Sequence, residues 1–126
     1  MALQRLLSLD IGISTGWATF VGGELTDHGV VSDYLLDRFC KEQAERHWDY
    51  IIGEEPVIIR GQLGDALSRT VFIIKHRLPQ VELFYATAWK GTKHGQEKVK
   101  KGISAHERDA IRFGIWYRKT ILKTPT

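Results

Sequence analysis

Short apolar runs alternate with charged, amphipathic segments along this chain. The pattern predicts strands over residues 4–10, 17–21 and 25–32, because each run is apolar or alternates between apolar and polar positions. Gly22 and Gly23 separate the second and third runs and predict a tight hairpin turn. Asp10 therefore lies at the end of the first strand of an antiparallel meander.

The pattern changes to alternating helices and strands in the second part of the chain. Helical spacing of apolar residues predicts helices over residues 33–48 and 65–78, and apolar runs predict strands over 50–56 and 81–86. This alternation implies parallel pairing with crossover helices. Residues 90–101 are basic and interrupted by glycine, so we expect a loop with a short helix. Ser104 and Glu107 form a capping-box pattern that predicts the start of a last helix, whose core stripe is Ala110, Ile111, Gly114, Ile115 and Leu122.

These elements predict an α/β fold with a five-stranded mixed sheet flanked by helices. The length of 126 residues, with 43% hydrophobic and 26% charged residues, fits a single globular domain over residues 1–126. Cys40 is the only cysteine, so no intrachain disulfide can form, and no run of 18 apolar residues is present. We therefore expect a cytoplasmic protein without a membrane partner.

The net charge of +3 hides an asymmetry between two parts of the chain. Residues 1–85 carry 8 Lys and Arg against 12 Asp and Glu, whereas residues 86–126 carry 10 against 3. The C-terminal third is thus near +7 and the rest near −4. A patch of one sign fits a polyanionic partner, with nucleic acid as the leading candidate, although a solvated basic face without a ligand has the same composition.

Four side chains are expected to converge at one end of the sheet. Asp10 and Glu54 each end a predicted strand, and His106 and Asp109 share one face of the last helix. Ligands in open α/β sheets gather outside the carboxyl ends of the strands. Buried carboxylates are costly unless a cation compensates them, so these residues are candidate metal ligands.

The candidate ligands favour a hard cation. Three carboxylates and one imidazole suit Mg²⁺ or Mn²⁺, whereas zinc prefers Cys and more His. Two such ions about 3.5–4 Å apart can activate a water and stabilise the leaving oxygen of a phosphodiester. We therefore expect two Mg²⁺ or Mn²⁺ ions per site and phosphodiester cleavage without a nucleotide cofactor.

Three segments resemble the acidic motifs of RuvC-type Holliday junction resolvases, above all the small phage-encoded members. They are Ser8-Leu9-Asp10-Ile11-Gly12 with Thr15-Gly16-Trp17-Ala18, then Ile51-Ile52-Gly53-Glu54-Glu55-Pro56, then His106-Glu107-Arg108-Asp109-Ala110. Their order and separations also match, and the resemblance covers essentially the whole chain. It implies an RNase H-like nuclease domain, a homodimer, and symmetric paired nicking of four-way DNA junctions with Mg²⁺ or Mn²⁺. A phage-encoded protein would act in the host cytoplasm.

The resemblance also implies roles for individual residues. By position, Asp10 is the first-strand metal ligand that bridges both ions, Glu54 is the second-strand carboxylate, and His106 and Asp109 are the C-terminal pair. All four are then catalytic as well as metal-binding. Many relatives have Asp where this chain has His106, so its imidazole is expected to make activity pH-sensitive. Glu55 is the alternative to Glu54, since neighbouring strand residues point to opposite faces.

The segment Ala88-Trp89-Lys90 resembles one that follows the fifth strand in phage-type members, where the lysine faces the DNA backbone. Trp89 is a candidate DNA contact beside it, and further basic residues extend the same surface: Lys93, Lys98, Lys100 and Lys101. Phosphate contacts of this kind fix orientation and make affinity fall with salt, but they carry little sequence specificity.

The sequence leaves several alternatives open. The same fold and metals could act on other branched or hybrid nucleic acids, or the chain could be a noncatalytic DNA-binding module. The Asp10 hairpin is also similar to the phosphate-binding hairpin of sugar kinases and actin-like ATPases, but those proteins need two such domains. Well-studied resolvases place an aromatic wedge after the second-motif Glu, whereas Pro56-Val57-Ile58-Ile59 follows here. The apolar face of residues 65–78 is our expected dimer interface.

Overall fold

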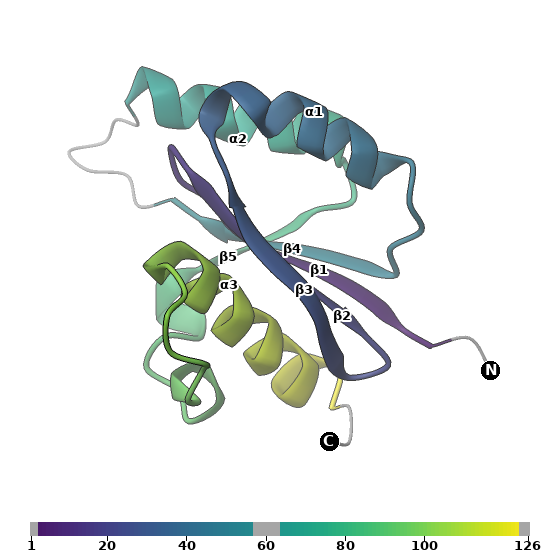
Figure 1. Cartoon of the computed structure of the whole chain (residues 1–126), viewed down its shortest axis with the longest axis vertical. Coiled ribbons are helices and arrows are strands. Elements are labelled where there is room, and N and C mark those ends of the chain that lie inside the picture. The colour runs from purple at the N-terminus through teal and green to yellow at the C-terminus, as the bar shows by residue number, and fades with distance from the viewer. Residues whose placement is uncertain (1–2, 57–63, 124–126) are drawn as a thin grey trace.

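The structure is a computed structural model that describes residues 3–56 and 64–123. In this part of the chain, one five-stranded sheet separates α1 and α2 on one side from α3 on the other (Figure 1). The strand order is β3-β2-β1-β4-β5, so the first strand of the chain lies at the centre. Residues 57–59, which follow the second acidic motif, lie outside the described residues.

The first three strands form the predicted antiparallel meander. They are β1 (Arg5–Asp10), β2 (Thr15–Val21) and β3 (Glu24–Val31), with Asp10 opposite Gly16 in the β1–β2 ladder. The turn at Gly22 and Gly23 has φ values of 60° and 94°, which glycine adopts without steric cost. A bulge interrupts the β2–β3 ladder between Thr19 and Phe20.

The remaining strands pair in parallel, as predicted. The strand β4 (Tyr50–Glu55) pairs with β1, and β5 (Glu82–Tyr85) pairs with β4. The crossover helices are α1 (Asp33–Ala44) and α2 (Asp65–Arg77). Because β1 and β4 run in the same direction, Asp10 and Glu54 reach the same end of the sheet.

Two apolar cores lie on opposite faces of the sheet. The face under α1 and α2 buries Leu7, Leu9 and Ile51, together with Ile74 of α2. The other face buries Leu6, Phe20 and Ile52 against α3 (Ala105–Trp116). This alternation along β1 directs Ser8 and Asp10 toward α3, because successive strand side chains point to opposite faces.

Short helical segments complete the C-terminal third. They are η1 (Ala86–Ala88) and η2 (His94–Gln96) before α3, and the π-helix η3 (Tyr117–Ile121) after it. The expected loop with a short helix over residues 90–101 is therefore confirmed. No helix among the described residues is long and apolar enough to cross a membrane.

Two expectations from the sequence are wrong in detail. The first helix ends at Ala44 rather than extending to residue 48, because Trp48 turns into the core from the loop before β4. The apolar face of α2 is also unavailable as a dimer interface, since Val71, Ile74 and Leu78 pack against the sheet. The large apolar side chain that α2 does expose is Phe72, on the other side of the helix.

Candidate active site

Two strand ends place a pair of carboxylates under the first turn of α3. Asp10 and Glu54 are only 7% and 9% exposed. Glu54 follows Ile52 on the α3 face, so strand alternation turns Glu55 to the opposite face. The structure therefore favours Glu54 over Glu55 as the acid beside Asp10.

The two buried carboxylates influence each other strongly. Burial, together with the neighbouring Asp10 carboxylate, raises the pKa of Glu54 to about 7, while Lys90 acts in the opposite direction. Two like charges in a poorly hydrated site resist simultaneous ionisation. A cation beside the pair therefore stabilises the ionised form of both carboxylates.

Helix α3 is held close enough to the sheet to bring its first turn to this pair. Ser104 caps the helix, because its hydroxyl accepts a hydrogen bond from the Glu107 backbone N–H at 3.2 Å, as predicted. The buried Ser8 hydroxyl donates to the Ala110 carbonyl oxygen at 2.8 Å. Gly16 permits the close approach, since a Cβ at this position would collide with the backbone carbonyl oxygen of His106. These contacts fix His106 and Asp109 relative to β1 and β2.

His106 and Asp109 complete the cluster from the helix side. The His106 Nδ1 lies 3.0 Å from Asp10 Oδ2, although the imidazole is half exposed. Asp109 Oδ2 lies 4.0 Å from Lys90 Nζ, which is in turn 3.2 Å from Glu54 Oε1. The four candidate residues thus form one connected cluster.

Lys90 has a different position from the one that the sequence suggests. We expected this side chain to face DNA, but its ammonium group lies between Glu54 and Asp109 and 5.5 Å from the centre of the Trp89 ring. The nearby carboxylates, Glu54 first, raise the pKa of Lys90 despite its partial burial. Its charge therefore offsets part of the acidic excess of the site.

Sequence reasoning missed the partner of His28. The His28 Nδ1, on the edge strand β3, lies 2.6 Å from Glu107 Oε2 in the first turn of α3. This hydrogen bond lowers the pKa of Glu107. The Glu107 carboxylate accepts a hydrogen bond from the hydroxyl of the N-cap Ser104, as the capping-box pattern predicts, and also joins α3 to a residue 79 positions earlier. No local pattern in the sequence indicates such a distant contact.

The proposed DNA contact by Trp89 is wrong, because the indole is buried. Trp89 is 1% exposed and stacks on Phe113 of α3 at 5.2 Å between ring centres. Its carbonyl oxygen accepts a hydrogen bond from the Thr92 hydroxyl at 2.6 Å. Trp89 instead anchors the basic segment that follows it to the core.

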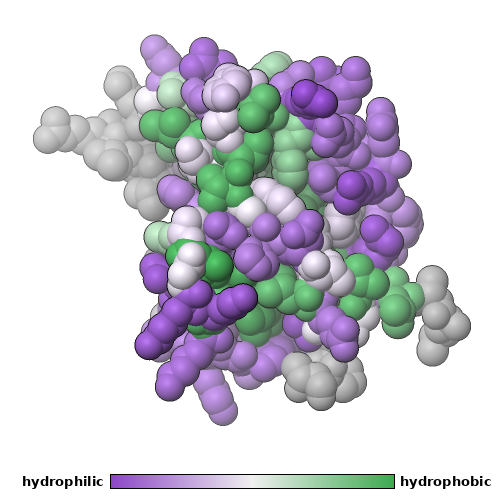
Figure 2. Space-filling view, viewed as in Figure 1, coloured by the Kyte–Doolittle hydropathy of each residue, from purple (hydrophilic) through white to green (hydrophobic). Residues whose placement is uncertain are grey.

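The basic segment itself is well placed to meet an anionic surface. Glu97 holds it against α3 and η3, since Arg112 of α3 donates to the Glu97 carbonyl oxygen and Lys119 Nζ of η3 lies 2.6 Å from Glu97 Oε1. The remaining lysines of the segment are all exposed or partly exposed: Lys93, Lys98, Lys100 and Lys101. Figure 2 shows hydrophilic side chains projecting at the lower left, over the part of Figure 1 that connects β5 to α3.

The donor atoms fit a hard divalent cation in their chemistry. Glu54 Oε1 is buried and accepts no hydrogen bond within the described residues, although it forms the ion pair with Lys90. Carboxylate oxygens of this kind are the ligands that Mg²⁺ and Mn²⁺ prefer. As arranged here, however, the described residues contain no group of three or more His, Cys, Asp or Glu that could hold a metal. The Lys90 ammonium group lies between Glu54 and Asp109, so it supplies positive charge to that part of the cluster.

Comparison with known proteins links the fold of this chain to solved structures. A scan of protein-family models and a search of curated proteins each found no match. The chain resembles Thermus thermophilus RuvC in complex with a Holliday junction substrate, with a TM-score of 0.71 and 12% identity over 93% of this chain and 96% of that one. It also resembles a second Thermus thermophilus RuvC structure, with a TM-score of 0.69 and 15% identity over 96% and 98% of the two chains. The predicted similarity to RuvC is therefore confirmed at the level of structure, and the chain has the RNase H-like fold of RuvC.

Proposed function

We propose that this chain is a metal-dependent, structure-selective endodeoxyribonuclease that resolves four-way DNA junctions by paired symmetric nicks. The observation that carries the proposal is the cluster of Asp10, Glu54, His106 and Asp109 at the carboxyl ends of two parallel strands. One of the two RuvC structures with the same fold holds a Holliday junction substrate. Chemistry and fold therefore favour the same class of reaction.

The acidic residues would hold the cations that the reaction needs. Asp10 and Glu54 would bind from the strands and Asp109 from the helix, while His106 orients the Asp10 carboxylate through its contact at 3.0 Å. A divalent ion, Mg²⁺ or Mn²⁺, supplies a nucleophile at neutral pH and neutralises charge on the phosphate when bound. Lys90 would leave the acids as cations enter, which frees its ammonium group to contact a DNA phosphate.

The exposed lysines after β5 would position the substrate. The segment that carries Lys93, Lys98, Lys100 and Lys101 is anchored at Trp89 and at Glu97, so its backbone is held relative to the acidic cluster. Contacts to phosphates fix the register of a nucleic acid without reading its sequence. Binding should therefore weaken steeply with salt for every branched DNA of similar size.

Paired nicking requires two active sites, so a homodimer is part of the proposal. The outer layer of helices exposes aromatic side chains that a second copy could cover, namely Tyr34 of α1, 82% exposed, and Phe72 of α2, 66% exposed. Light scattering at the working concentration tests this part separately. A monomer under conditions that support paired nicking would contradict it.

A comparison of substrates tests the reaction itself. The protein is incubated with Mg²⁺ and a synthetic four-way junction, a linear duplex of the same sequence, a flap and an RNA–DNA hybrid. We expect nicks at symmetric positions in two opposing strands of the junction, with 5′-phosphate and 3′-hydroxyl ends. Equal cleavage of the linear duplex, or a preference for the hybrid, would contradict junction selectivity.

A further inference from the structure

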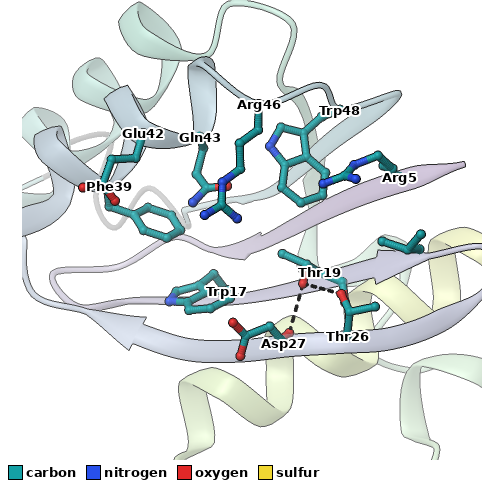
Figure 3. Close-up of a pocket in the computed structure, with 11 residues that line it drawn as sticks. Arg5, Trp17, Thr19, Thr26, Asp27, Phe39, Glu42, Gln43, Arg46 and Trp48 are labelled. Carbon is teal, nitrogen blue, oxygen red and sulfur yellow. Dashed lines mark hydrogen bonds between the residues drawn. The ribbon is translucent and has the colours of Figure 1, made fainter.

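A cavity lies on the face of the sheet opposite the candidate active site, toward the other end of β1 from Asp10. It has a volume of about 330 Å³ and lies between the C-terminal half of α1, the loop that follows it and the first three strands. Figure 3 shows side chains from α1 and the loop (Gln43, Arg46 and Trp48) reaching toward residues of the sheet (Trp17, Thr19 and Asp27). None of its lining residues belongs to the candidate active site, so the cavity is a separate feature of the molecule.

Two guanidinium groups of the cavity have unused binding capacity. Arg5 stacks over the Trp48 ring at 5.3 Å, and Arg46 extends from the loop after α1. Within residues 3–56 and 64–123, neither guanidinium makes a hydrogen bond or an ion pair. Two unpaired guanidinium groups at one cavity favour an anion with several oxygens, such as a phosphate or a carboxylate.

Buried polar atoms of the same residues also lack partners. Gln43 and Trp48 are only 6% and 7% exposed, yet Gln43 Oε1 and Trp48 Nε1 have no hydrogen-bond partner in the described part of the chain. Arg5 Nε is also buried and has no hydrogen-bond partner among the described residues. Buried polar groups are almost always hydrogen-bonded, because leaving them unpaired is costly. These three atoms, two donors and one acceptor, are free to pair with a polar ligand in the cavity.

Aromatic side chains form part of the cavity wall. Trp17 and Phe39 lie 5.5 Å apart between ring centres, and the indole of Trp17 covers Gly29, where a Cβ would approach Trp17 to 2.9 Å. Carboxylates of Asp27 and Glu42 line the rim. Such walls suit a planar ring that stacks on aromatic faces and donates hydrogen bonds from its edge.

We infer that this cavity binds a nucleoside 5′-monophosphate group. The phosphate meets Arg5 and Arg46, the base stacks beside Trp17 and Phe39, and an amino group on its edge donates to Asp27. The volume lies at the lower end of the range for ligand pockets, roughly 300–1,000 Å³, so it takes one nucleotide and not a duplex. The inference does not rest on the proposed nuclease activity. A free mononucleotide and the 5′-phosphorylated end of a DNA strand present the same chemistry.

The tryptophans of the chain provide a test with internal controls. Trp17 and Trp48 line the cavity, whereas Trp89 and Trp116 are buried in the core on the other face. In ¹⁵N-labelled protein without divalent metal, deoxyadenosine 5′-monophosphate is titrated to about 10 mM, which would saturate even a millimolar site. We expect saturable shifts of the Trp17 and Trp48 indole N–H signals while those of Trp89 and Trp116 stay in place. Uncharged deoxyadenosine and ribose 5-phosphate should each bind about 10-fold more weakly, because each lacks half of the recognised group.

Two single substitutions distinguish specific binding in the cavity from nonspecific attraction of the anion to positive charge. Arg46→Ala should weaken binding at least about 10-fold, whereas Lys41→Ala, which removes an exposed charge from the helix outside the cavity, should leave it unchanged. A 5′-phosphorylated DNA tetramer that shifts the same two signals would identify strand ends as a source. If the mononucleotide binds and the tetramer does not, the free nucleotide is the ligand. The inference is overturned if neither ligand shifts the Trp48 signal, or if Arg46→Ala binds as tightly as the wild type.

Discussion

The two halves of the candidate active site are built differently. Asp10 and Glu54 lie on neighbouring parallel strands, are almost fully buried and have backbones fixed by the sheet ladders. The side chains of His106 and Asp109 are 50% and 29% exposed and depend on how closely α3 packs. The strand half therefore sets the charge of the site, and the helix half is positioned by contacts made elsewhere.

This difference predicts which substitutions should reduce the cleavage rate most. Removing a charge from the strand half deprives the site of a group that the sheet holds in place. Removing a side chain from the helix half leaves the buried carboxylates and their demand for a cation intact. Substitutions in the strand half should therefore reduce the cleavage rate more than substitutions in the helix half.

Asp10→Asn should nearly abolish cleavage of a four-way junction. The amide keeps the size of the side chain but loses the charge that faces Glu54 and His106, so we expect a loss of about 10³-fold or more. Single-turnover cleavage with Mg²⁺ measures it. Junction binding should be retained, and a variant that cuts normally would show that the site is assigned wrongly.

Glu54→Gln and its neighbour Glu55→Gln provide a matched pair on one strand. Glu54 shares the site with Asp10, so its loss should reduce the rate about 10²-fold, whereas Glu55 on the other face should matter less than about 2-fold. The same cleavage assay compares them. A larger effect at Glu55 would reverse the assignment of the second-strand acid.

Gly16→Ala tests how the helix half is positioned. A Cβ here would collide with the His106 carbonyl oxygen, so the start of α3 must move away from β2. We expect a loss of about 1–3 kcal/mol in the free energy of unfolding and a rate reduction of about 10- to 100-fold. Gly91→Ala, where a Cβ meets no atom within 4 Å, is the control. Equal behaviour of the two variants in urea unfolding and in cleavage would disprove this positioning role.

His106→Ala should have a smaller effect on the rate than either strand substitution. Its imidazole contacts Asp10 but is half exposed, and the buried acids remain, so we expect a loss of about 10-fold. Mg²⁺ titrations of the cleavage rate should also show weaker binding of the metal. A loss as large as that of Asp10→Asn would mean that the two halves contribute equally.

The pH dependence of stability tests the charge of the strand half without any substrate. The pKa of Glu54 is raised from 4.5 to about 7, so the folded protein binds more protons than the unfolded chain between these values. Without metal, the free energy of unfolding should therefore fall by about 1–3 kcal/mol as the pH rises from 5 to 8. Urea unfolding of wild type and Glu54→Gln measures this, and the variant should lack most of the decrease. If the free energies of unfolding of the two proteins decrease equally with pH, Glu54 is not the group responsible.

Much of this architecture could be predicted from local sequence patterns. Strand ends at Asp10 and Glu54, the meander turn at Gly22 and Gly23, and the cap at Ser104 each depend on a few neighbouring residues. The alternation of strands and helices along the chain then indicates parallel pairing of the later strands. Together these local features suffice to place both carboxylates at one end of the sheet.

The contacts that the sequence did not reveal all join distant parts of the chain. Trp89 is buried because Phe113 and Trp116 form an aromatic core on the far side of the sheet. His28 meets Glu107 only because the edge strand lies beside the start of α3. Lys90 turns toward the acids because β4 and β5 are neighbours, which places the residues after β5 near Glu54.

Cleavage of a synthetic four-way junction, with wild type and Asp10→Asn compared side by side, tests whether the acidic cluster cuts DNA. With Mg²⁺, the wild type should make paired nicks in opposing strands, and the variant should bind the junction without cleaving it. An intact junction in the presence of either Mg²⁺ or Mn²⁺, despite binding by the wild type, would contradict the proposed activity.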